Sequence, residues 1–239
     1  MRTIKLFTII LFATAIFQTT TLQASSVSDG RQTRQLTGFH GVSVSSGIDL
    51  YLTQKNVEEV FVEADSDDLE KIITKVEDGI LKIYIKDKSW WGIGWNNRPR
   101  KVYVSFINLD KLHASAGSDV KAESRFKLDK LDLDVSSGSD VKLELEANEV
   151  TVGTSSGSDI SLKGKATTIH ADASSGSDLD AGDLETKKCT ASVSSGSDIK
   201  VNVTEELIAD ASSGGDITYS GNPKIKNINK SSGGDVNAR

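Results

Sequence analysis

The chain has 239 residues, of which 28 are Lys or Arg and 34 are Asp or Glu, so its formal net charge is -6 at pH 7. An acidic chain lacks the bulk positive charge that attracts nucleic acid or an anionic lipid surface. The composition therefore argues against a nucleic-acid partner, and the length fits one domain or two.

The first 24 residues have the pattern of a secretory signal peptide. Arg2 and Lys5 precede an apolar run at residues 6–17, and a polar stretch then leads to a cleavage site after Ala24. The run is shorter than the roughly 20 residues of a membrane span, so we predict no transmembrane span in the mature chain. Cleavage removes two positive charges and no negative charge, which takes the net charge from -6 to -8. The sequence thus predicts export to the periplasm, the outer membrane, the cell surface or the medium.

Residues 25–35 are polar and lack apolar periodicity, and we expect a flexible leader there. Residues 36–110 contain segments with a period of two, as in strands with one buried face. They predict a β-rich N-terminal cap that covers the first strand edge of the repeats that follow. Within the cap, Glu77-Asp78-Gly79 predicts a hairpin turn, and residues 65–69 predict a short helical turn. The predicted strands are residues 42–52, 57–62, 71–76, 80–85 and 101–107.

Every Trp of the chain lies within residues 89–98, between two of these predicted strands. Trp faces stack on sugar rings and on partner surfaces, which favours a loop that contacts a ligand or partner. Alternatively, the same side chains plug the open end of the fold. The residues concerned are Trp90, Trp91 and Trp95.

One phrase, Ser-(Ser/Ala)-Gly-(Ser/Gly)-Asp followed by Val, Ile or Leu, occurs seven times after residue 114. Its Asp residues are 18 to 21 residues apart, and an eighth copy places Asp49 70 residues before the first of the seven. This period is too short for helical-hairpin repeats of about 33 to 47 residues and matches one coil of a β-solenoid. The coil geometry is therefore expected to begin near residue 45 and then to be interrupted. The seven Asp residues are Asp119, Asp140, Asp159, Asp178, Asp198, Asp216 and Asp235.

When the copies are aligned on the Asp, apolar residues fall into columns nine and seven positions before it and one and three positions after it. Polar residues stand between them, so each coil is predicted to run strand, tight corner, strand, with one face buried. The Gly of the phrase supplies the backbone freedom of the corner. The chain's only Cys, Cys189, lies in the column with Leu131 and Val150, which indicates a small buried apolar residue.

The corner phrase, together with upstream segments at residues 39–44, 47–52 and 76–83, resembles the head GIN domain family of exported auto-transporter adhesins, over about residues 36–239. Asp49 stands where the Gly-Ile-Asn signature has Asn. The resemblance implies a right-handed β-helix and an envelope or surface location, and it offers no catalytic residues to transfer. The predicted fold is thus all-β, a right-handed parallel β-helix of about 19-residue coils over residues 111–239, with the β-rich cap over residues 36–110.

Stacked coils lie about 4.8 Å apart, so the seven Asp residues are predicted to form a column of like charges. Repulsion between neighbours is of order 1 kcal/mol even in water, and something must offset it. Hydrogen bonds from corner amides and Ser hydroxyls are one solution. Ca²⁺ is the other, because stacked Gly and Asp corners are similar to the nonapeptide β-roll of RTX toxins. The period here is about twice nine, so we expect no cofactor and keep Ca²⁺ as the alternative.

Catalytic and metal sites are not predicted. A glycosidase needs two carboxylates in unlike environments, whereas a column of like copies offers no asymmetry. His40, His113 and His170 have no metal-ligand spacing and indicate exposed polar residues. No Ser has a His and Asp that set it apart from its repeats.

These features favour a non-enzymatic, adhesin-like binding protein of the envelope or cell surface, whose partner is a glycan or another envelope or surface protein. Two alternatives stay open: a structural spacer, and a β-helix enzyme acting on polysaccharide through an asymmetric groove. Few residues follow Asp235, so the strand edges of the final coil are predicted to be uncovered. A homodimer through the terminal coils and a monomer protected by charge are both compatible with the basic residues there: Lys224, Lys226, Lys230 and Arg239.

Overall fold

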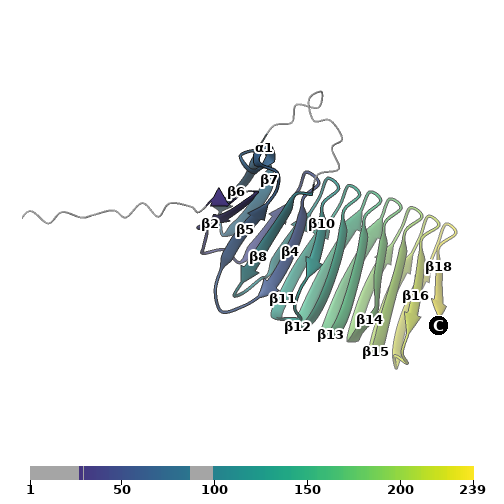
Figure 1. Cartoon of the computed structure of the whole chain (residues 1–239). Coiled ribbons are helices and arrows are strands. Elements are labelled where there is room, and N and C mark those ends of the chain that lie inside the picture. The colour runs from purple at the N-terminus through teal and green to yellow at the C-terminus, as the bar shows by residue number, and fades with distance from the viewer. Residues whose placement is uncertain (1–26, 29, 87–98) are drawn as a thin grey trace, which may run out of the picture.

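The computed structural model describes residues 27–28, 30–86 and 99–239. The predicted signal peptide and the three Trp residues lie outside this range. The described residues form strands wound into a parallel β-solenoid, with one short helix near its N-terminal end (Figure 1). That helix has four residues, and no helix in the described ranges is long and apolar enough to span a membrane. In chain order the elements are β1 (Val27–Ser28), β2 (Arg31–Arg34), β3 (Gly41–Val44), β4 (Asp49–Gln54), β5 (Glu59–Glu63), α1 (Ser66–Leu69), β6 (Ile72–Glu77), β7 (Ile80–Ile85), β8 (Lys101–Phe106), β9 (Lys111–Ala114), β10 (Asp119–Ala122), β11 (Phe126–Val135), β12 (Asp140–Ser155), β13 (Asp159–Ser174), β14 (Asp178–Val193), β15 (Asp198–Ala211), β16 (Asp216–Ser220), β17 (Ile225–Lys230) and β18 (Asp235–Ala238).

The N-terminal part mixes antiparallel and parallel pairing. Strand β5 lies antiparallel between β2 and β8, while β8 runs parallel to β4. Strands β6 and β7 form the predicted hairpin, in which Asp78 and Gly79 have φ of 51° and 74°. Positive φ at both central residues is what a type I′ turn requires. The predicted hairpin turn and the predicted helical turn, now α1, are both confirmed.

The prediction of a flexible leader over residues 25–35 is wrong for its last part. Residues 31–34 form β2, whose main chain pairs with β5. The Arg34 guanidinium also donates to the carbonyl oxygens of Leu69 and Ile72, at 2.9 and 3.4 Å. Main-chain pairing on the edge of a sheet needs no apolar periodicity, so the polar composition concealed this strand.

The eighth copy of the phrase builds a coil that stacks on the others despite its distance in sequence. Strands β3 and β4 pair in parallel with β9 and β10. The corner is continued as well, because the main-chain N–H of Ile48 donates to Ser118 Oγ at 3.3 Å. The expectation of an early, interrupted coil is therefore confirmed. This coil lies on the N-terminal side of the boundary predicted at residue 110.

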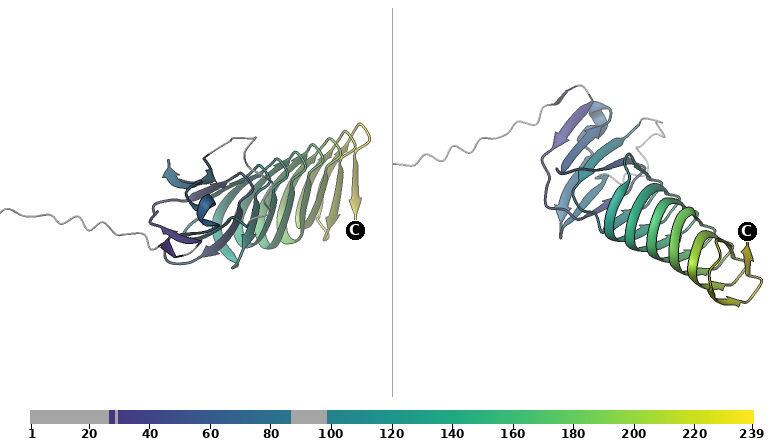
Figure 2. Two further views of the ribbon diagram at one scale, coloured as in Figure 1. Left: turned by 45° about the horizontal axis from the view of Figure 1, so that its top comes forward. Right: turned by 90° about the horizontal axis from the view of Figure 1, so that it is seen from below.

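From β12 onward the coils pair through both of their faces, with shifts of register between β13 and β14 and between β14 and β15. Asp140, Asp159 and Asp178 are direct neighbours, and the pairing continues around the second bend of each coil, which is seen in the successive rings of Figure 2. The predicted interior columns are buried, and Ile228 in the last coil is the exception at 36% exposed. The buried column nine positions before the Asp consists of Leu131, Val150, Ile169, Cys189 and Leu207, each at most 2% exposed.

Each corner contains two successive residues in the left-handed conformation. In the second of the seven corners these are Ser137 and Gly138, with φ of 58° and 68°. In the first corner Ala116 takes the place of the Ser, so this position needs no hydroxyl. A residue with a Cβ costs about 1–2 kcal/mol there. Hydrogen bonds between coils offset this cost, because the N–H of Gly138 donates to the carbonyl of Ser156 in the next corner at 3.1 Å. The corners thus hold one another in register.

The Ser immediately before the Asp points inward and is fully buried in five corners. In two of these corners its hydroxyl donates to the main-chain carbonyl three residues earlier, from Ser158 to Ser155 at 2.9 Å and from Ser177 to Ser174 at 2.8 Å. In the last two corners this Ser is replaced by Gly215 and Gly234. There the main-chain N–H donates to the equivalent carbonyl, at 2.9 Å in both cases. The same acceptor is satisfied in both kinds of corner.

Candidate functional site

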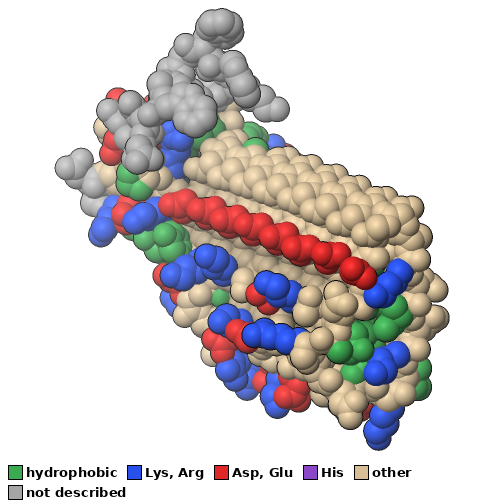
Figure 3. Space-filling view, turned by 90° about the vertical axis from the view of Figure 1, so that its right-hand side faces the viewer, with side chains coloured by type: hydrophobic (Ala, Val, Ile, Leu, Met, Phe, Trp, Pro, Cys, Tyr) green, Lys and Arg blue, Asp and Glu red, His purple; other side chains and the backbone are tan. Residues whose placement is uncertain are grey.

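The seven predicted Asp residues form one straight column along the corner edge of the solenoid. Parallel pairing aligns each with the next, from Asp119 to Asp235. Asp49 extends the column by one coil, because Leu50 pairs with Val120. The carboxylates appear as an unbroken stripe in Figure 3. We call these eight residues the Asp column.

Most carboxylates of the Asp column have no partner within the described residues. Asp235 pairs with Lys230 Nζ at 3.1 Å, whereas the main-chain N–H of Asp140, beside Asp119, donates to the carbonyl oxygen of Ser118 at 3.2 Å. The expectation that Ser hydroxyls bond each carboxylate is wrong, since the corner hydroxyls bond main-chain atoms instead. The column is therefore not neutralised by the corner that carries it.

Burial and the charges of neighbouring members shift the ionisation of two carboxylates of the column. Partial burial raises the pKa of Asp159, and the charges of Asp140 and Asp178 raise it further. The pKa of Asp198 is raised in the same way, by burial and then by Asp178 and Asp216. At both positions, burial and the neighbouring charges therefore disfavour the ionised carboxylate.

At the opposite bend of the coils, charged side chains also stack in a column, but their signs alternate from coil to coil. Lys127, Glu146, Lys165 and Glu185 are successive neighbours there. Nζ of Lys165 lies 3.8 Å from Glu185 Oε1, and both side chains are exposed. Such exposed pairs contribute at most about 1 kcal/mol each, but they avoid repulsion. Positive and negative side chains thus alternate in this column, whereas the Asp column contains carboxylates only.

We expect Asp159→Asn to stabilise the protein at pH 7, because it relieves two like-charge contacts. The pKa of Asp159 in the folded state is raised above the unfolded value of 3.8. Protonated Asp159 therefore favours the folded state at low pH, and this stabilisation is lost as the pH rises through the folded-state pKa. The substitution should thus raise Tm by about 2–4 °C at pH 7 in low salt, for a relief of roughly 1 kcal/mol. The gain should vanish at pH 3 and shrink in 1 M salt, where the Debye length is about 3 Å.

Asp172→Asn is the matched control for this thermal melt. Asp172 lies on the same strand, β13, but its neighbours in register are Gly153 and Ser192, which carry no charge. Its substitution should leave Tm unchanged. Equal gains from the two variants would mean that the column is not under electrostatic stress.

No group of three or more His, Cys, Asp or Glu side chains is placed to hold a metal ion among the residues that the structure describes. The Asp column presents one carboxylate per coil along a line, whereas Ca²⁺ takes six to eight converging oxygens. The three His residues also gather no metal ligands. His40 Nδ1 lies 2.7 Å from Asp110 Oδ1, and His113 Nδ1 lies 3.2 Å from Asp134 Oδ2.

Cys189 is buried in the interior column, as predicted. Burial raises the pKa of its thiol to about 12. Because the thiolate is the reactive form, this residue contributes packing rather than chemistry.

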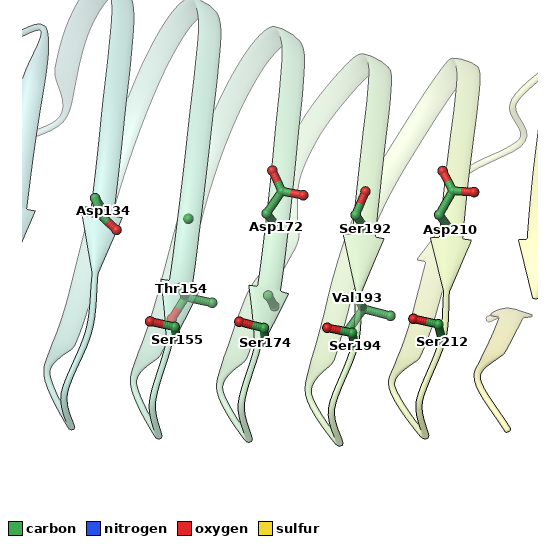
Figure 4. A pocket seen from close by; sticks show the side chains of 12 residues that line it. Asp134, Thr154, Ser155, Asp172, Ser174, Ser192, Val193, Ser194, Asp210 and Ser212 are labelled. Carbon is green, nitrogen blue, oxygen red and sulfur yellow. The ribbon is translucent and has the colours of Figure 1, made fainter. Parts of the chain in front are cut away.

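A shallow groove runs along the flat face that leads into the corners, with a volume of about 390 Å³. Figure 4 shows Ser155, Ser174, Ser194 and Ser212 in one row, with Asp172 and Asp210 in the row beside it. Ser192 and Gly153 separate the carboxylates of that second row. The groove is open, Ser and Asp make up most of its lining residues, and it repeats from coil to coil.

Sequence reasoning missed an aromatic cluster on the outer face of the N-terminal strands. The rings of Tyr51 and Tyr103 stack at 4.9 Å between centroids, and Phe61 tilts against Tyr103 at 5.9 Å. Pairing across β4, β8 and β5 brings these residues together. Tyr51 also follows Asp49 by two residues, so the cluster borders the Asp column. Only the strand order, which no local pattern reveals, could have identified it.

The family follows from a comparison over most of the chain. A family model described as "Putative auto-transporter adhesin, head GIN domain" matches residues 38–223. The chain belongs to this family. The resemblance indicated by the corner phrase is therefore confirmed, and the match covers both the interrupted first coil and most of the repeats. Among curated proteins, none matches the chain.

Solved structures share the head GIN domain fold at low sequence identity. A putative adhesin from Bacteroides fragilis is 22% identical, with a TM-score of 0.79 over 87% of this chain and 96% of that one. A putative lipid binding protein from Parabacteroides distasonis is 18% identical, with a TM-score of 0.70 over the same shares. A putative adhesin from Parabacteroides merdae is 14% identical, with a TM-score of 0.68 over 90% of this chain and 100% of that one. These likenesses confirm the predicted fold class.

Proposed function

We propose that this head GIN domain protein is a non-enzymatic, exported binding protein of the cell envelope or cell surface. The observation that carries the proposal is the parallel register, which repeats outward side chains in columns along the whole solenoid. Such a surface is long, open and repetitive, whereas small substrates are usually bound in concave pockets. It suits contact with an extended partner, and the family's adhesin description supports this reading.

The arrangement of the polar groups does not favour the enzyme alternative. Apart from Asp235, which pairs with Lys230, the carboxylates of the Asp column stand in like repeats, so no acid is set apart from a neighbouring base. In the described ranges, the His40–Asp110 and His113–Asp134 pairs have no hydrogen bond to a Ser hydroxyl. A nucleophile activated by a base is therefore not assembled there.

We propose a glycan or another envelope or surface protein as the partner, with Trp90, Trp91 and Trp95 among the contact residues. The exported chain, residues 25–239, would be applied to a glycan array and to surface-protein extracts, beside a variant with all three Trp changed to Ala. We expect a defined class of glycan or protein to be retained and the triple variant to lose it. A Tyr51→Ser/Tyr103→Ser variant tests in the same way whether the aromatic cluster contributes to retention.

Other outcomes of this experiment separate the alternatives. Release of soluble sugar from a polysaccharide would favour an enzyme. Retention of no glycan or protein would favour a spacer. Retention on lipid vesicles alone would instead parallel the neighbour described as lipid binding.

Export itself is tested in cells. We expect a C-terminal epitope tag to be found outside the cytoplasm and the mature chain to begin near Ser25. Protease treatment of intact cells then distinguishes a surface location from a periplasmic one. A cytoplasmic, uncleaved chain would contradict the proposal.

We propose further that the Asp column works without a metal cofactor. Millimolar Ca²⁺ should leave Tm unchanged, and so should a chelator, because the carboxylates lie in line and do not converge on one point. A rise of several degrees that the chelator abolishes would establish the Ca²⁺ alternative.

A further inference from the structure

The last coil differs from the others at its inward positions. Strand β17 pairs with β15 on one side, and β18 pairs with β16, while no described strand pairs with their outer edges. The register aligns Lys226 with Leu207 and Lys230 with Ala211. Leu207 and Ala211 are 0% and 3% exposed and belong to the core. Lys therefore occupies two core columns that hold no charged residue from β11 to β15.

Both Lys side chains reach across the end of the core. Lys226 Nζ lies 5.8 Å from the centroid of Tyr219, an inward residue of β16 that is only 8% exposed. Lys230 Nζ lies 3.1 Å from Asp235 Oδ1 on β18. The two ammonium groups thus tie β17 to the opposite strands of the end and stand over the last core layer.

The same edge is otherwise suited to pairing. Ile225 and Ile228 are 59% and 36% exposed, and the main chain of β17 and β18 is extended. Open edges of this kind recruit strands from other chains, and inward-pointing charges are a recognised way to prevent it. Another coil stacked here would bury both ammonium groups in apolar columns, which is costly unless each is paired.

We propose that Lys226 and Lys230 form a charged barrier that keeps the open edge of the last coil from pairing with a second copy of this chain. A symmetric end-to-end dimer would bring the same two Lys residues of both copies together, adding repulsion to desolvation. Of the homodimer and the charge-protected monomer, the two alternatives stated for this end of the chain, the proposal favours the monomer. It does not depend on which partner the outward faces bind.

The test gives the last coil the residues that its neighbour has. The variant Lys226→Leu/Lys230→Ala reproduces Leu207 and Ala211 and should associate at least about tenfold more tightly than the wild type in analytical ultracentrifugation. The wild type should remain monomeric at high micromolar concentration. Amide hydrogen exchange should slow at residues 225–230 of the variant as it associates, since those amides would then be paired.

Two controls separate edge pairing from a general loss of charge. Lys163→Leu/Lys165→Ala makes the same changes at exposed positions of β13 in the middle of the solenoid, and it should stay monomeric. Lys226→Glu/Lys230→Glu keeps the edge charged and should also stay monomeric. If circular dichroism shows the first variant to be unfolded, Lys226→Gln/Lys230→Gln provides the same comparison with a smaller expected shift.

The proposal is overturned if the folded Leu/Ala variant, or the Gln variant in its place, remains as monomeric as the wild type. It is equally overturned if the wild type already dimerises with slowed exchange at residues 225–230. Association of the β13 control to the same degree would show that added apolar surface suffices, and the barrier would then have no role.

Discussion

Ile169→Asp is expected to unfold the solenoid or destabilise it by more than the roughly 2–5 kcal/mol that a cavity alone costs. Ile169 is 0% exposed and stacks between Val150 and Cys189 in the interior column. A carboxylate there has no polar partner, and burying an unpaired charge is far more costly than losing methyl groups. Because each coil packs only on its neighbours, the damage should spread to the coils on both sides.

Two matched variants isolate the cause. Ile169→Ala makes the cavity without the charge, and chemical denaturation should place it between the wild type and the Asp variant. His170→Asp adds a carboxylate one residue later, on the exposed face, where the effect should stay within about 0.5 kcal/mol. Similar unfolding midpoints for Ile169→Asp and His170→Asp would refute the assignment of inward and outward positions.

The interior columns were predictable because each coil presents the same pattern to its neighbours. A period-two pattern within a coil fixes which side chains point inward, and a 19-residue period across coils fixes which of them stack. Both are local properties of the chain. The Asp column followed for the same reason, and so did the burial of Cys189.

The pairing of distant or polar strands was not predictable in this way. Strand β2 pairs with β5 through its main chain, and its Arg-Gln-Thr-Arg sequence carries no apolar signal. The stacked rings of Tyr51 and Tyr103 meet only because β4 and β8, far apart in sequence, are neighbours in the sheet. These features depend on strand order, which non-local contacts decide.

The electrostatic character of the Asp column was anticipated only in part. Its repulsion follows from the period alone, but its lack of neutralising partners depends on where the Ser hydroxyls point. They face inward to main-chain carbonyls, because the left-handed turn rotates the Ser before the Asp into the core. Whether Trp90, Trp91 and Trp95 form a contact loop stays a prediction, since they lie outside the described residues.

Gly164→Ala is expected to be the most damaging change of a single methyl group among the variants considered. Gly164 has φ of +114°, and a Cβ built there would lie 2.1 Å from the carbonyl oxygen of Leu145 in the preceding coil. That atom belongs to the main chain of β12, which is held in register on both faces and cannot turn aside. Strain of the left-handed region, about 1–2 kcal/mol, adds to overpacking of about 1–3 kcal/mol.

Two other glycines of the solenoid separate these two contributions. Gly176 has φ of +68°, but no atom lies within 4 Å of the position that a Cβ would occupy, so Gly176→Ala should cost only about 1 kcal/mol. Gly153 lacks a positive φ, and the nearest neighbour of a Cβ there would be Asp134 Oδ1 at 3.6 Å. Gly153→Ala should therefore be neutral or stabilise by about 0.4–1 kcal/mol through the unfolded state.

The unfolding free energies of the three variants, measured in denaturant, separate the cost of backbone strain from the cost of the close contact. We expect Gly164→Ala to lie lowest, Gly176→Ala to lie between it and the wild type, and Gly153→Ala to match or exceed the wild type. Gly221, with φ of +87° and a Cβ contact of 2.1 Å to the carbonyl oxygen of Val203, should repeat the result of Gly164. If Gly164→Ala and Gly176→Ala were equally stable, the close approach of β13 to β12 would not be a constraint. Backbone conformation alone would then explain why Gly occupies these positions.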